Sequence, residues 1–146
     1  MNRAILVALG TGAIISSAAA FTAGGVGDEG PAITQQQYGA RLRAIASERG
    51  AHEARCDGVA GFERELCRIE AAANESVHMA EAEAAFRRTQ QSARAALRAR
   101  IDARYQMDRA KCGALGGFKR DKCLVQVHAT RGRAMLAAAQ PYEVRF

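Results

Sequence analysis

The sequence predicts an all-α protein of two disulfide-stapled helical hairpins that share a long central helix, either continuous or broken once. A Cys-x10-Cys segment occurs twice, beginning at Cys56 and at Cys112, and the two copies contain every cysteine of the chain. Prolines occur only at 31 and 141, and the residues between them are rich in Ala, Arg, Glu and Gln, which favour helix. No period-two alternation of β-branched residues indicates a strand.

The N-terminus has the features of a secretory signal peptide. A short positive start at 1–3 precedes an apolar segment at 4–15 and small residues at 16–20. We therefore expect a signal peptide at 1–20, cleaved after Ala20, and a flexible Gly-rich tether at 21–33. An uncleaved membrane anchor is the alternative, although the short core and its glycines argue against it. Export to the periplasm follows from the cleaved signal.

The first hairpin repeat is expected over 34–86. Thr34 and Gln37 match a capping box, in which each side chain satisfies a free backbone donor at a helix start. Tyr38, Leu42 and Ile45 then form an apolar stripe at helical spacing. This incoming helix is expected to end near Cys56.

The outgoing helix is expected to begin near Phe62 and to carry a seam of apolar residues at three-four spacing. The seam consists of Phe62, Leu66, Ile69, Ala73, Val77, Ala80 and Ala84. Nothing afterwards clearly stops the helix, so it reads as one helix over 62–111, about 75 Å long. The alternative is a break within 88–92, where Thr89 is a suitable cap.

The second hairpin repeat is expected over 87–146. The offset between the two cysteine segments aligns Ile45 with Ile101 and Ile69 with Val125. The last helix is expected to begin near Phe118, to carry Val125, Ala129 and Leu136 on its seam, and to end before Pro141. Each repeat is therefore an incoming helix, a cysteine loop and an outgoing helix.

Two disulfide connectivities are compatible with the cysteine spacing. In the first, Cys56 bonds Cys67 and Cys112 bonds Cys123, so that each bond closes its own hairpin turn. In the second, each segment is a continuous helix and its cysteines bond across to the other segment. Glycines within the segments favour the first, because a chain reversal needs residues that accept positive φ. These turn glycines are Gly58, Gly61, Gly113, Gly116 and Gly117.

The twin loops resemble a family of small exported proteins of Gram-negative bacteria. Cys56-Asp57, Gly61 and Cys67 carry the first match, and the second is carried by Cys112, Leu115, Gly117, Arg120-Asp121 and Cys123. The resemblance covers roughly residues 33–135 and implies two helical hairpins in the cell envelope, with no established activity. Phe62 and Phe118 stand where the family pattern has Asn, and the family's proline break between repeats is missing.

Charge is divided unevenly along the chain. Residues 21–86 contain 6 Arg and Lys against 11 Asp and Glu, whereas residues 87–146 contain 14 against 4. One interpretation is that the two halves attract each other, within a molecule or by self-association. The other is that the basic half binds an anionic envelope lipid, polymer or protein. The residues expected to do so are Arg87, Arg88, Arg94, Arg98, Arg104 and Arg109. Export argues against nucleic acid as a partner.

The sequence predicts neither an enzyme nor a cofactor. It lacks a Cys-x-x-Cys redox motif, a glycine-rich phosphate loop and a nucleophile elbow. The cysteine spacing does not suit zinc. We therefore expect a periplasmic structural or interaction protein. The alternative is a periplasmic stress or soft-metal module that binds copper through a His and Met set. That set is His78, Met79, Met107 and Met135, whose methionines also fit a single helical stripe.

Overall fold

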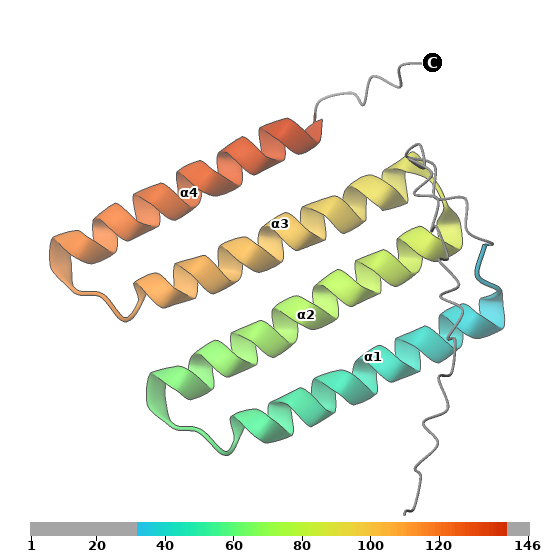
Figure 1. Cartoon of the computed structure of the whole chain (residues 1–146), viewed down its shortest axis with the longest axis horizontal. Helices are drawn as coiled ribbons and strands as arrows, with labels where there is room; N and C mark the ends of the chain where they lie inside the picture. Colours follow the sequence, from blue (N-terminus) through green and yellow to red (C-terminus); the bar gives the residue numbers. More distant parts are fainter. Residues whose placement is uncertain (1–31, 140–146) are drawn as a thin grey trace, which may run out of the picture. The chain divides into compact units, whose positions relative to one another are not determined.

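The computed structural model describes residues 32–139, which form four α-helices (Figure 1). These are α1 (Gln35–Cys56), α2 (Gly61–Arg87), α3 (Gln90–Cys112) and α4 (Gly117–Ala139). The described residues contain no strand, as predicted. The expected signal peptide, nearly all of the expected tether and Pro141 lie outside the described residues.

The start of α1 confirms the predicted capping box. The Thr34 hydroxyl accepts a hydrogen bond from the Gln37 backbone N–H at 3.2 Å, and the Gln37 side chain accepts one from the Thr34 N–H at 2.8 Å. These bonds satisfy two donors that the first helical turn leaves free. Ile45, from the predicted stripe, is buried.

The central helix is broken, so the continuous helix over 62–111 is wrong and the alternative break is confirmed. α2 ends at Arg87, and Arg88 adopts the left-handed conformation with φ 51°. Thr89 then caps α3: its hydroxyl accepts from the Ser92 N–H at 3.1 Å, and its own N–H donates to the Ser92 hydroxyl at 3.1 Å. The second capping box therefore begins a new helix at Gln90, and α2 ends without a proline or a glycine.

The two hairpin turns have the same backbone pattern at equivalent positions. Gly61 and Gly117 have positive φ, 57° and 49°, where side chains are strained. A Cβ on Gly113 would lie 2.9 Å from the Ala110 carbonyl oxygen and would need a small shift of the backbone, which the first turn accommodates with Asp57 at the equivalent position. The other two predicted turn glycines, Gly58 and Gly116, lie in the turns without positive φ.

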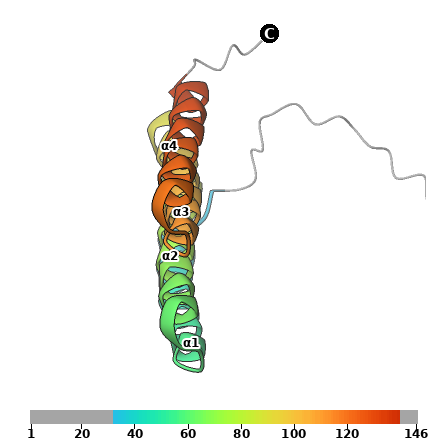
Figure 2. The ribbon, with the colours of Figure 1, turned by 90° about the vertical axis from the view of Figure 1, so that its left-hand side faces the viewer.

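The helices of residues 32–139 lie side by side in chain order (Figures 1 and 2). Contacts join α1 to α2, α2 to α3 and α3 to α4, and within the described residues no other pair of helices is in contact. The buried side chains are correspondingly few and small. They are Ile45, Cys56, Ala71, Ala73, Ala82, Ser92, Ala96 and Cys112.

The predicted seam of the last helix exists, but it has no partner among the described residues. Val125 and Leu136 are 70% and 71% exposed, and Ala129 is also exposed. α4 contacts α3 instead through the side that contains Val127, Arg131 and Ala134, which line a hollow shared with α3. The periodicity correctly indicated an apolar stripe, but periodicity alone does not identify what the stripe packs against.

None of the four described helices combines the length and the apolarity that crossing a membrane requires.

Candidate functional site

The four cysteines form the two disulfides predicted for stapled hairpins. Cys56 bonds Cys67 with a Cα–Cα separation of 5.5 Å, and Cys112 bonds Cys123 with a separation of 5.7 Å. Cys56 and Cys112 are completely buried and are the largest fully buried side chains of the described residues. With so little apolar area buried elsewhere, these bonds carry much of the hairpin stability. The crossed connectivity is thereby excluded.

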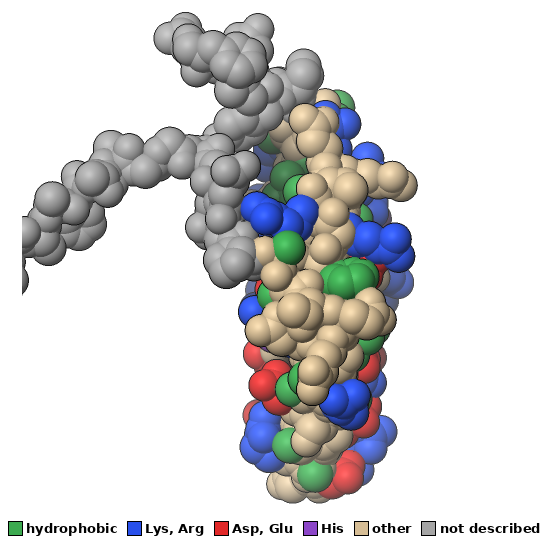
Figure 3. Space-filling view, turned by 90° about the vertical axis from the view of Figure 1, so that its right-hand side faces the viewer, with side chains coloured by type: hydrophobic (Ala, Val, Ile, Leu, Met, Phe, Trp, Pro, Cys, Tyr) green, Lys and Arg blue, Asp and Glu red, His purple; other side chains and the backbone are tan. Residues whose placement is uncertain are grey.

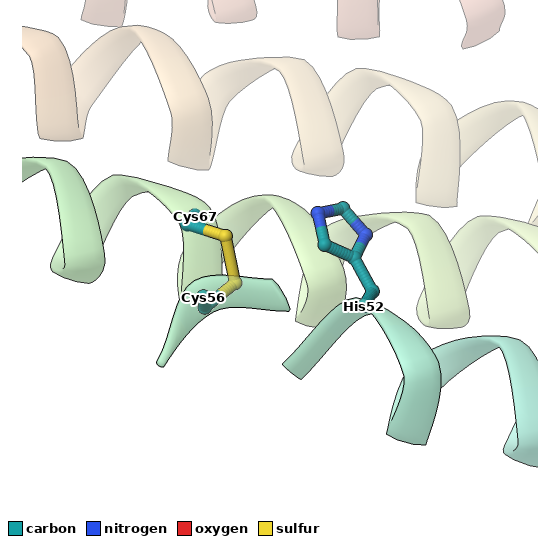
Figure 4. A group of neighbouring side chains, drawn as sticks. All are labelled: His52, Cys56 and Cys67. Carbon is teal, nitrogen blue, oxygen red and sulfur yellow. A yellow bond between two sulfur atoms is a disulfide. The ribbon is translucent and has the colours of Figure 1, made fainter. Parts of the chain in front are cut away.

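His52 lies beside the first disulfide (Figure 4). A ring nitrogen of His52 and the sulfurs of Cys56 and Cys67 lie within 4.8 Å of one another, which is the spacing of metal ligands. The two sulfurs are bonded to each other, however, and the thiolate is the form of cysteine that binds metal. In the second repeat the equivalent residue is Asp108. His52 was not among the residues predicted for a site, although its four-residue spacing from Cys56 places the two on one side of α1.

Tyr38 joins the start of α1 to the end of α2. Its hydroxyl donates to Glu83 Oε2 at 2.6 Å, and its ring stacks on Phe86 with the centroids 4.6 Å apart. The hydrogen bonds that Glu83 accepts from Tyr38 and Arg87 lower the pKa of that carboxyl group, and the bond to Glu83 raises the pKa of Tyr38. This network fixes the open end of the first hairpin, opposite its disulfide.

The two hairpins contain small surface hollows at equivalent positions but with different chemistry. The hollow between α1 and α2, about 250 Å³, contains an ion pair of Arg49 with Glu75. The hollow between α3 and α4, about 220 Å³, has Tyr105 and Arg131 at the equivalent positions, with the guanidinium 5.0 Å from the ring centroid. The hairpins therefore share one register of packing, and the residues that fill it have diverged.

The predicted cationic residues are all exposed, but they do not form one patch. Arg87 is paired with Glu83 at 2.7 Å, and Arg104 lies 3.6 Å from Asp108. On α3, Arg98 and Arg109 point in directions about 20° apart, whereas Arg104 points about 120° away from Arg98. Arg88 occupies the break between α2 and α3, and Arg94 lies in the first turns of α3.

Further exposed cations lie on α4, and they were not predicted from the sequence. We define the cationic set as the exposed Lys and Arg of α3 and α4 that have no carboxylate within ion-pair distance among the described residues. The set is Arg94, Arg98, Arg109, Lys119, Arg120, Lys122 and Arg133. The excess of Lys and Arg within the sequence of α4 indicates the four members that lie on that helix, which are Lys119, Arg120, Lys122 and Arg133. Figure 3 shows the described surface from one side, with acidic side chains confined to its lower part.

Two members of the cationic set line the largest of the hollows described here, about 500 Å³. Arg109 comes from α3 and Arg120 from α4. Phe62, Ile69 and Leu124 contribute apolar surface to the same hollow, and its remaining lining includes one carboxylate, that of Glu65. The hollow thus combines two guanidinium groups with an apolar wall.

The predicted soft-metal set is distributed over three helices. His78 and Met79 lie on α2, Met107 on α3 and Met135 on α4. α2 and α4 are not in contact, so α3 separates Met79 from Met135. His78 Nδ1 lies 3.6 Å from Glu81. One site that uses all four side chains is therefore not formed within the chain.

No protein-family model, no curated protein and no solved structure matches this chain.

Proposed function

We propose that this chain is a non-enzymatic periplasmic protein of the structural or interaction type, and that its basic second hairpin docks on an anionic component of the cell envelope. The observation that carries the proposal is the cationic set: exposed cations on α3 and α4 whose charge no described carboxylate neutralises. The two disulfides support an oxidising compartment, in which such bonds persist.

An anionic amphiphile, such as a phospholipid with an acidic head group, is the component that the second hairpin suits best. Arg109 and Arg120 supply two charges at the rim of a hollow whose wall includes Phe62, Ile69 and Leu124. A phosphate can engage the guanidinium groups, since Arg presents a fork of donors that matches phosphate oxygens. Each Lys or Arg close to an anionic membrane contributes about 1 kcal/mol to attraction. Acidic polymers and acidic proteins would meet the same charges but leave the apolar wall unused.

Vesicle binding tests this proposal. The chain is used in the form that the cell produces after processing, with both disulfides intact. It is sedimented with vesicles of phosphatidylglycerol and with vesicles of phosphatidylcholine. We expect binding only to the acidic vesicles and a steep loss of binding between about 0.1 M and about 1 M salt, because the screening length falls from about 10 Å to about 3 Å. Equal binding to both vesicle types, or binding that salt does not weaken, would overturn the proposal.

A matched pair of variants locates the binding surface. Arg109→Glu with Arg120→Glu reverses both charges at the hollow, and we expect at least a tenfold loss of affinity. Arg41→Glu with Arg55→Glu makes the same change in net charge at exposed positions of α1, and we expect it to retain most of the binding. Equal losses in both variants would mean that net charge, rather than the second hairpin, determines the attraction.

A further inference from the structure

The outer side of α4 carries an apolar stripe that no described residue covers. We define the outer stripe of α4 as Phe118, Lys122, Val125, Ala129, Arg133 and Leu136. All six are exposed, and Phe118 is 81% exposed. Large apolar side chains that gather on one face of a helix, at the spacing of a helix-helix seam, indicate a contact surface rather than scattered exposed residues.

The internal repeat identifies what such a stripe packs against. By the offset between the repeats, the outer stripe of α4 is equivalent to a series of residues on α2. These are Phe62, Leu66, Ile69, Ala73, Val77 and Ala80. That side of α2 packs on α3: the Phe62 ring lies 3.4 Å from the position of a Cβ on Gly113, and Glu81 pairs with Arg100 at 2.7 Å. Ala73 is only 8% exposed. The outer stripe of α4 is therefore equivalent to a surface that a helix covers in the first repeat.

The outer side of α1 is equivalent to the side of α3 that covers α2. The same offset relates Ser92, Ala96, Ala99, Ala103, Gln106 and Ala110 of α3 to a series of mostly small residues on α1. We call this series the outer stripe of α1; it is Gln36, Ala40, Arg43, Ser47, Gly50 and Ala54. All six are exposed, whereas Ser92 and Ala96 of α3 are each only 7% exposed. Small residues allow a neighbouring helix to approach closely, as α3 approaches α2.

We propose that the outer stripe of α1 from a second copy of this chain docks on the outer stripe of α4, so that the α2–α3 packing is repeated between molecules. The contact joins two different surfaces, so each added copy presents the same free stripes again. Such a head-to-tail contact builds an open row unless rotation closes it into a ring. The inference does not depend on the anionic partner proposed above, although Lys122 and Arg133 belong both to the cationic set and to the outer stripe of α4.

The charges at equivalent positions are compatible with this contact. The ion pair of Glu81 with Arg100 has no charged counterpart in the proposed contact. Its two positions are occupied by Ala137 of α4 and by Ala44 of the second copy, which are both neutral. At the turn, Asp57 of the second copy takes the place of Gly113, and Lys122 of α4 lies one helical turn from Phe118. A lysine and an aspartate therefore lie at the same end of the contact.

A symmetric pairing of two α4 helices is the competing arrangement. It would bring Lys122 and Arg133 of one copy close to the same cations of the other, and like charges in close contact oppose association. It would also leave the outer stripe of α1 exposed in both copies. The head-to-tail contact has neither consequence, because Arg43 is the only cation in the outer stripe of α1.

Sedimentation of the full-length chain tests the proposal. We expect a mass that rises with concentration. Val125→Glu with Leu136→Glu should weaken self-association at least about a hundredfold, since each substitution replaces an apolar side chain that the contact buries. Gln126→Glu with Thr130→Glu adds the same charge at exposed positions of α4 outside the stripe, and should leave association unchanged. Because all four residues are exposed, both variants should fold.

Mixing two defective variants distinguishes the head-to-tail contact from the alternatives. Ala40→Glu with Ala54→Glu disables the outer stripe of α1 and should also abolish self-association. Mixed with the α4 variant, it should form a one-to-one complex that grows no further, because each partner keeps one intact stripe. Self-association of the α1 variant alone would indicate symmetric α4 pairing and overturn the proposal. A wild-type chain that stays monomeric at millimolar concentration, or two variants that do not pair, would overturn it as well.

Discussion

The break between α2 and α3 predicts the sign of the change in stability that Arg88→Gly causes. That sign distinguishes a broken central helix from a continuous one. Arg88 has φ 51°, a left-handed conformation that costs about 1 to 2 kcal/mol for a residue with a Cβ. Glycine removes this cost, but it also gives the unfolded chain about 0.5 to 1 kcal/mol of additional conformational freedom. Arg88→Gly should therefore stabilise the protein by about 0.5 to 1 kcal/mol. In a continuous helix over 62–111 the same change would destabilise by about 1 kcal/mol.

The neighbouring substitution should have the opposite sign. Thr89→Ala removes the side chain that accepts from the Ser92 N–H at 3.1 Å, and the loss of such a cap costs about 1 kcal/mol. Arg88→Ala is the matched control, because it removes the guanidinium but keeps the left-handed strain, and we expect little change. For a domain of this size, 1 kcal/mol corresponds to about 3 to 5 °C in Tm.

Urea unfolding followed by far-UV circular dichroism provides the measurement. The free energies of unfolding should rank Arg88→Gly above the wild type and Thr89→Ala below it, with a common denaturant slope. Destabilisation by Arg88→Gly together with no effect of Thr89→Ala would refute the break. Stabilisation by Arg88→Ala equal to that by Arg88→Gly would show that side-chain charge, and not backbone strain, is responsible.

Three further predictions concern the first hairpin. Replacing both cysteines of the first disulfide with alanine should cost about 3 kcal/mol in the free energy of unfolding, because the bond closes a loop of about a dozen residues; a cost below about 1 kcal/mol would contradict the staple. Tyr38→Phe should destabilise at neutral pH, and the difference should shrink in acid. The hydrogen bond lowers the folded-state pKa of Glu83, so its contribution is present above the unfolded pKa and is lost as pH falls through the folded pKa; unfolding curves at several pH values test this, and a difference independent of pH would contradict it. Gly61→Ala should cost about 1 kcal/mol or more because of its positive φ, whereas Gly50→Ala, inside α1 with open space around its Cβ, should stabilise by about 0.5 to 1 kcal/mol; thermal melts that show the same sign for both would contradict these roles.

The hairpins were predictable because their signals are local. The first capping box, the cysteine spacing and the turn glycines each act within about a dozen residues, so sequence alone is sufficient. The break was harder to predict, because Arg88 is neither proline nor glycine and the alanines around it favour helix. Only the second capping box, from Thr89 to Ser92, indicates it. A Ser at the third position is a less familiar signal there than the Gln37 of the first box.

The candidate sites depend on non-local information that the sequence does not contain. The apolar stripe of α4 is visible in the sequence, but whether another helix covers it depends on how the hairpins follow one another. The hollow that brings Arg109 and Arg120 together likewise requires three helices to be in place. His52 was missed because its four-residue spacing places it near Cys56 only, whereas the position of Cys67 beside it depends on the turn and the closed disulfide.

The proposed docking on anionic membranes and the proposed self-association both involve α4, the last helix of the row. Their responses to added salt distinguish them. α2 is acidic and packs on basic α3, so the Glu81–Arg100 pair joins opposite charges. α4 is basic and also packs on α3. Of its Lys and Arg side chains only Arg131 pairs with a carboxylate of the described residues, and its apolar stripe has no partner among them. Added salt screens the cations, so it should release the chain from acidic vesicles. The contact between outer stripes depends mainly on apolar burial, which a salt such as sulfate strengthens, so self-association should persist or increase. If vesicle binding and self-association weakened together as salt was added, a single electrostatic interaction would explain both, and the apolar contact would have to be abandoned.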